Sequence, residues 1–342
     1  MKTLFIANVK PFKGTLEESL ISAFQANKVT IDTIYPERAP LIKNRHAFLG
    51  RLESKLMQII GYSERDLSKK IKKMDLKPYA FVFVLKGTSL NIKTLKYIKD
   101  KDIKVVCYNP DDPYNRASTN KNIRLSMRLY DIYFIWSRKL CEKIQKEEKM
   151  RCAYLPFAAD LSLHDVRSHQ ECFIKKYDIS FVGNWDEERE GWLERIREKE
   201  RLHLFGNNWG YKLKSKVLKK CFSGYPVTGD AFTKVVQESV ININILRLQN
   251  KGSNNMRSFE IPASGGFMLH EYSEEVEVLF EEGREVEFFR DHRELNEKIG
   301  YYLQHPDKAE QIARNAYKKV LSGDYTYNES VKTILREVHA LL

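Results

Sequence analysis

The sequence has no long apolar segment: its longest uninterrupted apolar run is the seven residues 79–85. A membrane-spanning helix needs about 18 or more such residues, so we expect no transmembrane segment. Cysteine is also scarce, because the 342 residues include only five, at irregular spacings, which favours a reducing compartment over a disulfide framework. Residues 3–9 are strand-like and follow no leader pattern. We therefore expect a cytoplasmic protein, with peripheral contact to a membrane left open.

Common nucleotide-binding motifs are missing as well. The chain contains neither a Walker A sequence nor G-x-G-x-x-G, which argues against a P-loop nucleotidase and an ordinary dehydrogenase. No cluster of Cys and His has the spacing of a zinc site, so we expect no bound metal. A length of 342 residues predicts roughly two domains, and 42% hydrophobic residues can give each of them a core.

Positive charge is present in excess, and only in the first half. Residues 1–160 hold 31 Lys and Arg against 17 Asp and Glu, a net charge of +14, whereas residues 161–342 have a net charge of −2. Such an asymmetry indicates that the first half meets an anionic partner. A phosphorylated glycan, a lipid headgroup and a nucleic acid all fit this description, and a merely solvated helix face at 65–77 is the plainer alternative.

Strand-length apolar runs alternate with segments of helical periodicity, which predicts βαβ units and parallel sheets. The expected strands are 3–9, 29–34, 79–85, 103–109, 131–136, 177–183, 202–206, 239–245, 266–271 and 285–289. The expected helices include 41–60, 192–199, 230–238, 254–263, 291–303 and 309–321, together with one that Thr15 caps. Two Rossmann-like α/β domains follow, one at 1–160 and a second at 161–325, with a helix at 326–342.

Ligands of open α/β sheets bind beyond the carboxyl ends of the strands, so the residues that follow each strand are the first candidates. In the second half these are Gly183, Asn184, Gly206, Asn207 and the loop 246–255. In the first half they are Lys10, Gly14, Lys86, Gly87, Asp111 and Asp112. A glycine after a strand is often no more than a turn, and an Asp-Asp-Pro sequence can also be one.

The stretch 251–266 is the most informative part of the chain. Its polar, glycine-containing loop precedes a predicted helix, whose unpaired N–H groups favour an anion such as diphosphate. Ser253 and Asn254 are residue types that cap helices. Arg257 would lie in the first turn, where a cation opposes the helix dipole unless an anion is bound, and Glu260 would share its face. A surface Arg–Glu pair is the alternative.

On these residues the sequence resembles a known family. The pattern NNMRSFEIPASGGFMLHE at 254–271, with ISFVGNW at 179–185, resembles the donor domain of CgeB-like proteins, which are glycosyltransferases of the GT-B fold. The segments KG at 86–87, YNPDDPYN at 108–115 and YLPFAAD at 154–160 resemble the amino-terminal domain of the same family. The resemblance implies two Rossmann-like domains that face each other across a cleft. It also implies that the final helix crosses back to the first domain.

The resemblance further implies a nucleotide diphosphate sugar, with a UDP-sugar expected, as the co-substrate of a metal-independent and retaining transfer without any other cofactor. Glu260 matches the second glutamate of an E-x7-E element and would hold the ribose, although Gly252 stands in place of the first glutamate. Arg257 would stabilise the leaving diphosphate, and Asp111 or Asp112 would act on the acceptor hydroxyl. The remaining expected donor contacts are Gly183, Asn184, Gly206, Asn207, Thr228, Gly229, Ser253, Asn254, Asn255 and Gly265. Lys10, Gly14, Lys86 and Gly87 are the acceptor-side candidates.

Other functions fit the same patterns. An epimerase of the same fold would also bind a UDP-sugar, but it would not need the +14 first half. A glycosyltransferase that modifies DNA would use that charge for nucleic acid, and a non-catalytic basic binding protein would use it for nucleic acid or a membrane. Salt-sensitive DNA binding would separate a DNA-modifying transferase from one with a carbohydrate acceptor.

Overall fold

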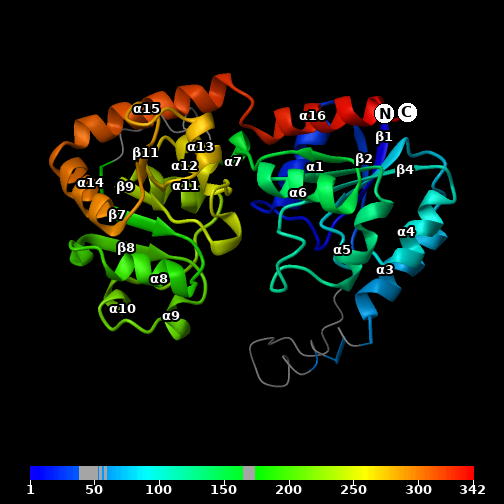
Figure 1. Ribbon diagram of the computed structural model, residues 1–342, viewed down its shortest axis with the longest axis horizontal. Helices are drawn as coiled ribbons and strands as arrows, with labels where there is room; N and C mark the ends of the chain where they lie inside the picture. Colours follow the sequence, from blue (N-terminus) through cyan, green and yellow to red (C-terminus); the bar gives the residue numbers. More distant parts are fainter. Residues whose placement is uncertain (38–52, 54–55, 58–59, 165–173) are drawn as a thin grey trace. The chain divides into compact units, whose positions relative to one another are not determined.

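The computed structural model describes residues 1–37, 53, 56–57, 60–164 and 174–342, and the chain falls into two compact units (Figure 1). Unit 1 comprises residues 1–155 and 331–342, and unit 2 comprises residues 156–330. The chain therefore leaves unit 1 at residue 155 and re-enters it at residue 331, where the sequence predicted boundaries at 160 and 325. None of the helices described is long and apolar enough to cross a membrane.

Unit 1 is built on one sheet of six parallel strands in the order β2-β1-β3-β4-β5-β6. These strands are β1 (Lys2–Ile6), β2 (Thr30–Ile34), β3 (Phe81–Leu85), β4 (Lys104–Asn109), β5 (Ile132–Ile135) and β6 (Cys152–Tyr154). The sequence predicted all of them except β6, whose three residues are too few to show a pattern. The strand β3 lies inside the sheet with every side chain buried, in keeping with its run of five apolar residues.

Several helices of unit 1 begin where a polar side chain caps them. Thr15, Asn91 and Ser137 each accept a hydrogen bond from the backbone N–H three residues further on. The helices are α1 (Leu16–Ala26), α3 (Tyr62–Lys73), α4 (Ile92–Lys99), α5 (Lys121–Ser126) and α6 (Arg138–Glu148), with a 3-10 turn at Met127–Leu129. Helix α16 (Tyr327–His339) carries the chain from unit 2 into unit 1. Most of the helix predicted at 41–60 lies outside the described residues.

Unit 2 has a second parallel sheet, of five strands in the order β11-β10-β9-β7-β8. They are β7 (Tyr177–Val182), β8 (Leu202–Phe205), β9 (Ser239–Asn244), β10 (Met268–Glu271) and β11 (Glu287–Phe289). The helices are α7 (Leu161–His164), α8 (Glu187–Glu194), α9 (Trp209–Lys212), α10 (Leu218–Cys221), α11 (Asp230–Gln237), α12 (Arg257–Ala263), α13 (Glu274–Leu279), α14 (His292–Gln304) and α15 (Pro306–Ser322), with 3-10 turns at Lys199–Arg201 and Leu248–Asn250.

The prediction of a helix at 192–199 is wrong in its position, because α8 begins at Glu187. The side chain of Asp186 accepts a hydrogen bond from the backbone N–H of Arg189, and Glu187, Glu188 and Glu190 follow in the first turn. An acidic first turn complements the positive end of the helix dipole. This start brings Arg189 under the ends of the neighbouring strands.

The central strand β9 buries side chains on both faces of its sheet. Ile241 and Ile243 join the apolar core that also contains residues of α14 and α15. The alternate residues Asn242 and Asn244 face the other way, where Asn242 donates to the carbonyl group of Val236 at the end of α11. Since both asparagines are 2% exposed, their amides depend on these internal hydrogen bonds. Strand β9 is thus fixed on both faces, and the candidate site lies at its carboxyl end.

Strands β7 and β8 end in two loops that touch. A Cβ atom on Gly206 would lie 2.0 Å from the carbonyl oxygen of Gly183, and Gly206 has a φ of +143°. Only glycine fits at position 206, because the backbone of Gly183 lies too close for a side chain. The sequence alone does not reveal this reason.

Replacing Gly206 by alanine should lower the free energy of unfolding by at least about 2 kcal/mol, because the added carbon collides with backbone that has no room to move. Gly191→Ala in α8 is the matched control, since a Cβ atom added there would have no atom within 4 Å. This control should be neutral or stabilising by up to about 1 kcal/mol. Urea unfolding of both variants measures the contrast, and similar stabilities would show that the loops separate freely.

Candidate functional site

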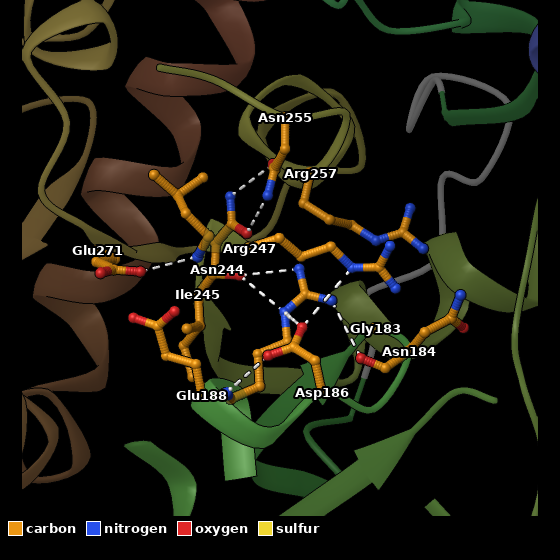
Figure 2. Close-up of polar contacts among 12 residues, drawn as sticks. Gly183, Asn184, Asp186, Glu188, Asn244, Ile245, Arg247, Asn255, Arg257 and Glu271 are labelled. Atoms are coloured by element: carbon orange, nitrogen blue, oxygen red, sulfur yellow. Dashed lines mark hydrogen bonds and ion pairs between the residues drawn. The ribbon is translucent and has the colours of Figure 1, made fainter. Parts of the chain in front are cut away.

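The carboxyl ends of β7 and β9 are joined by one buried guanidinium group, that of Arg189 on α8. It donates two hydrogen bonds to the carbonyl oxygen of Ile245, at 2.9 and 3.1 Å, and one to the carbonyl oxygen of Asn184, at 3.1 Å. Ile245 follows β9 and Asn184 follows β7, so a single side chain fixes both loops (Figure 2). The arginine thereby sets the backbone positions at the ligand-facing edge of the sheet.

Two more arginines stand beside Arg189, and we call the three the arginine cluster: Arg189, Arg247 and Arg257. In Figure 2 the side chains of Arg247 and Arg257 point the same way, toward the loop of Gly183 and Asn184. The side chain of Arg247 is 43% exposed and that of Arg257 is 25% exposed, so solvent reaches both. The arginine cluster therefore offers two accessible guanidinium groups above one buried group.

The positive charge of this cluster is only partly balanced. Burial lowers the pKa of Arg189 to about 10, Asp186 opposes that shift, and the charges of Arg247 and Arg257 add to it. Asp186 lies 3.4 Å from Arg189 and 3.7 Å from Arg247, which is too far for strong hydrogen bonds. A bound anion would relieve the repulsion among the three arginines, so the site is suited to a phosphate or diphosphate group.

Arg257 is held in place by three neighbours. Its Nε donates to the carbonyl oxygen of Val182 at 3.2 Å, its Nη1 pairs with Glu260, and the guanidinium lies 4.1 Å from the centre of the Phe232 ring. The predicted Arg–Glu pair is thus present, but Glu260 is buried instead of lying on the surface. The pair fixes the direction in which Arg257 points.

Glu260 lies at the centre of a buried polar network. One carboxylate oxygen pairs with Arg257, and the other lies 3.6 Å from Nε2 of His164. Burial alone would raise the pKa of Glu260, but Arg257 and His164 outweigh it and hold the pKa at about 2. His164 in turn contacts the hydroxyl group of Thr233 at 3.1 Å. The carboxylate is engaged inside the protein, and its contact with a ribose stays a prediction.

This network predicts a pH-dependent contribution to stability. Because the pKa of Glu260 falls from 4.5 to about 2 on folding, its contribution is complete above pH 4.5 and is lost as the pH falls toward 2. Glu260→Gln should lower the free energy of unfolding by about 2 to 4 kcal/mol at neutral pH and by progressively less in acid. Chemical denaturation at several pH values measures the difference. A difference that does not change with pH would contradict the assignment. Glu310→Gln serves as the control, because the side chain of Glu310 on α15 is 60% exposed.

The loop that precedes α12 is organised by Asn255. Its side chain accepts a hydrogen bond from the backbone N–H of Ser258 at 3.0 Å, and the Ser258 hydroxyl accepts one from the backbone N–H of Asn255 at 3.2 Å. This reciprocal pair is a capping box. The amides of Asn255 and Asn244 also exchange hydrogen bonds of 2.9 and 3.0 Å, which ties the loop to β9 (Figure 2).

The prediction that Ser253 and Asn254 cap this helix is wrong, because the helix begins at Arg257. Ser253 donates to the carboxylate of Glu275 at 2.9 Å. Asn254 donates to the same carboxylate and accepts a hydrogen bond from the backbone N–H of Phe157. Both side chains are buried and hold the loop from inside, and their contact with the donor stays a prediction.

A group of alternating charges lies next to the arginine cluster. The ammonium group of Lys251 is 2.7 Å from Glu188 and also pairs with Glu271. Glu271 accepts a hydrogen bond from the backbone N–H of Leu246 at 2.9 Å, and burial raises its pKa although Lys251 opposes the shift. The hydrogen bond from Leu246 to Glu271 fixes the loop that begins after β9 (Figure 2).

The other predicted donor residues lie at the same edge or at turns nearby. Asn184 accepts hydrogen bonds from the backbone and side chain of Asn207, at 3.2 and 3.1 Å. Gly229 precedes α11 with a φ of +54°, and Thr228 beside it is exposed. Gly265 has a φ of +72° and ends α12, which explains its type without a ligand.

In unit 1 the structure brings two predicted residues together. Nζ of Lys86, after β3, lies 2.6 Å from the carboxylate of Asp111, after β4. The side chain of Asp112 does not join this pair. It accepts a hydrogen bond from the backbone N–H of Tyr114, which is the turn that the Asp-Asp-Pro sequence allows. A Cβ atom on Gly87 would lie 2.7 Å from the Tyr130 hydroxyl oxygen. Lys10 is exposed, and Gly14 has a φ of +91° before α1.

The side chains that commonly bind metal ions do not gather anywhere in the described ranges. No group of three or more His, Cys, Asp or Glu residues is placed there to hold a metal ion. That the reaction needs no metal ion stays a prediction.

Part of the chain matches the model of a known protein family. The model of a family described as glycosyl transferase-like matches residues 189–336, somewhat less than half of the chain. The match begins at Arg189 and includes Arg247, Arg257 and Glu260. None of the curated proteins matches the chain by sequence.

Solved structures are similar over almost the whole chain. Anabaena HepE in complex with UDP-glucose has a TM-score of 0.62 at 11% identity, with 99% of this chain and 100% of that one covered. A glycosyltransferase from Rickettsia africae has a TM-score of 0.61 at 12% identity and coverages of 98% and 97%. The DNA-modifying enzyme β-glucosyltransferase has a TM-score of 0.61 at 14% identity and coverages of 99% and 100%.

These likenesses establish the fold. The chain has two parallel α/β sheets of the GT-B glycosyltransferase type, as the sequence predicted. The predicted class of enzyme is thereby supported, while the CgeB-like group stays a prediction.

Sequence reasoning missed two members of the arginine cluster. Arg189 lies three residues after Asp186, and this spacing becomes a usable signal only once Asp186 is recognised as a helix cap. Arg247 lies in the loop 246–255, which is predicted as ligand-facing, but nothing in the sequence singles out this residue within the loop.

Proposed function

We propose that this protein is a glycosyltransferase that moves a sugar from a nucleotide diphosphate sugar, a UDP-sugar in the first instance, to an acceptor hydroxyl group. The observation that carries the proposal is the arginine cluster at the carboxyl edge of the second sheet, inside the region that matches the family model. HepE, whose structure holds UDP-glucose, supports the choice of donor.

In the proposed reaction the bond between the anomeric carbon and the diphosphate oxygen breaks, and the acceptor oxygen takes its place on that carbon. The leaving diphosphate gains negative charge as this bond breaks. Arg247 and Arg257 are partly exposed and would stabilise that charge, and Arg189 beneath them keeps the two loops in register. Three cations can serve here in the role for which other transferases use a metal ion, so we propose a metal-independent reaction.

Glu260 is proposed to act through Arg257. Its carboxylate holds the guanidinium in one direction, which reduces the reorganisation needed when diphosphate binds. A further contact of this residue with the donor ribose, and retention of configuration at the anomeric carbon, belong to the proposal by resemblance. Gly252 occupies the place of the first glutamate of the E-x7-E element, so another group must contact the sugar there.

The acceptor is proposed to bind to unit 1 and to be anionic. Lys86 and Asp111 lie where strands β3 and β4 end, and the excess positive charge of the chain lies in residues 1–160. A phosphorylated glycan, a lipid headgroup or a nucleic acid would suit this charge. Asp111 or Asp112 would accept the proton of the acceptor hydroxyl group.

A panel of nucleotide sugars tests the function. Purified protein is incubated with each sugar in the presence of a chelator, and nucleotide release is followed with and without phosphorylated glycans, lipids or DNA. We expect release to require one donor and to increase when the right acceptor is added. If no donor is bound or consumed under any of these conditions, the protein is not a transferase of this kind.

A further inference from the structure

A lysine-rich segment on unit 2 takes no part in the arginine cluster. Residues 206–229 contain five lysines and neither aspartate nor glutamate, although residues 161–342 as a whole have a net charge of −2. The five are Lys212, Lys214, Lys216, Lys219 and Lys220, and all are exposed. They lie on and between the short helices α9 and α10, which follow β8 (Figure 1).

The segment is anchored from below by apolar side chains. Leu213, Leu218 and Cys221 belong to the core of unit 2 and are 9% exposed or less. Most of the other residues of 211–220 face outward, among them two large side chains, Tyr211 at 72% and Val217 at 51% exposed. The outer face thus combines cations with exposed aromatic and aliphatic groups on a fixed backbone.

Most of this positive charge is not balanced by the protein. Lys214 pairs with Glu187 at 2.6 Å, and Lys212 lies 5.1 Å from the centre of the Trp185 ring. Lys216, Lys219 and Lys220 form no ion pair with any residue that the structure describes. Three neighbouring charges without a counterion attract an anionic surface.

We propose that the segment 211–220 docks on the surface of an anionic lipid bilayer. The lysines would contact lipid phosphate groups, Val217 would enter the headgroup region, and Tyr211 would lie at the interface. A nucleic acid fits less well, because an exposed valine gains nothing beside a phosphodiester backbone and none of the five cations is an arginine. The docking is independent of the sugar transfer proposed above.

Binding to vesicles tests this surface. Full-length protein is sedimented with vesicles of phosphatidylcholine alone and with vesicles that also contain phosphatidylglycerol. The wild-type protein should bind only the anionic vesicles, and less at high salt. The triple variant K216E/K219E/K220E should bind them at least about tenfold more weakly. Failure of the wild-type protein to bind anionic vesicles overturns the proposal.

A matched control separates this surface from net charge. The variant K93E/K96E/K101E changes three exposed lysines of unit 1 by the same amount of charge. It should keep most of the affinity for anionic vesicles. A loss equal to that of the unit 2 variant would overturn the proposal, because total charge alone would then account for binding.

Two substitutions of Val217 decide between lipid and nucleic acid without a change of charge. Val217→Ser should weaken vesicle binding severalfold and leave the affinity for duplex DNA unchanged. Val217→Trp should shift its fluorescence to shorter wavelength when anionic vesicles are added, a result that does not depend on how the triple variant folds. Three results together would overturn the proposal in favour of a nucleic acid: tight DNA binding by the wild-type protein, unchanged fluorescence of Val217→Trp with vesicles, and unchanged vesicle binding by Val217→Ser.

Discussion

Replacing Arg257 by alanine is expected to lower the turnover of the sugar donor by about 100-fold to 1,000-fold. The guanidinium group is directed by Val182, Glu260 and the ring of Phe232, so its position is set before any donor binds. In the proposed reaction it contacts the donor diphosphate and binds it more strongly as negative charge develops on the leaving oxygen, so the larger part of the loss should appear in kcat and a smaller part in KM. Initial rates of nucleotide release over a range of donor concentrations give both kcat and KM.

Arg314→Ala provides the comparison, because Arg314 on α15 is 62% exposed and pairs only with Glu310 on the same helix among the residues that the structure describes. Its activity should equal that of the wild-type protein. The activity of Arg257→Lys should fall between these two, since lysine keeps the charge but lacks the planar group that reaches Val182 and Glu260 from two separate nitrogen atoms. Equal activity in Arg257→Ala and Arg314→Ala would remove Arg257 from the reaction.

Replacing Arg189 by methionine should have the second large effect, on stability and donor binding together. Its guanidinium group supplies the hydrogen bonds to the carbonyl oxygens of Ile245 and Asn184. Without them, buried acceptors lose their partner and the loops after β7 and β9 are no longer joined. We expect a loss of about 3 kcal/mol in the free energy of unfolding and at least a tenfold weaker affinity for UDP.

Arg201→Met is the matched change for that experiment. The side chain of Arg201 is 41% exposed and pairs with Asp178, so its loss should cost less than about 1 kcal/mol. Urea unfolding and calorimetric titration with UDP supply the two quantities. Unchanged UDP affinity in a folded Arg189→Met protein would show that the two loops reach their positions without this link.

The sequence predicted the architecture because its signals are local. Continuous apolar runs such as residues 81–85 specify buried parallel strands, and the cap at Thr15 marks a helix start. The strand β6 and the helix α13 carry too few residues for a pattern. The start of α8 was missed because Asp186 was not recognised as its cap.

The site itself depends on contacts between distant residues. No local rule connects Arg189 with the carbonyl group of Ile245, which lies 56 residues further along the chain. Likewise, the side chains of Ser253 and Asn254 have the right type for a helix cap, but the distant Glu275 binds both of them. Residue type thus located the loop, and tertiary contacts decided which side chains face the solvent.

The most direct test of the account is the affinity of UDP for the wild-type protein, Arg257→Ala and Arg314→Ala. Calorimetric titration in the presence of a chelator measures this affinity, and GDP and ADP are titrated as further ligands. The account predicts that a nucleoside diphosphate binds the wild-type protein and Arg314→Ala equally and binds Arg257→Ala at least about tenfold more weakly. Binding of no nucleoside diphosphate to the wild-type protein, or equal affinity in all three proteins, would contradict the claim that the arginine cluster holds the donor diphosphate.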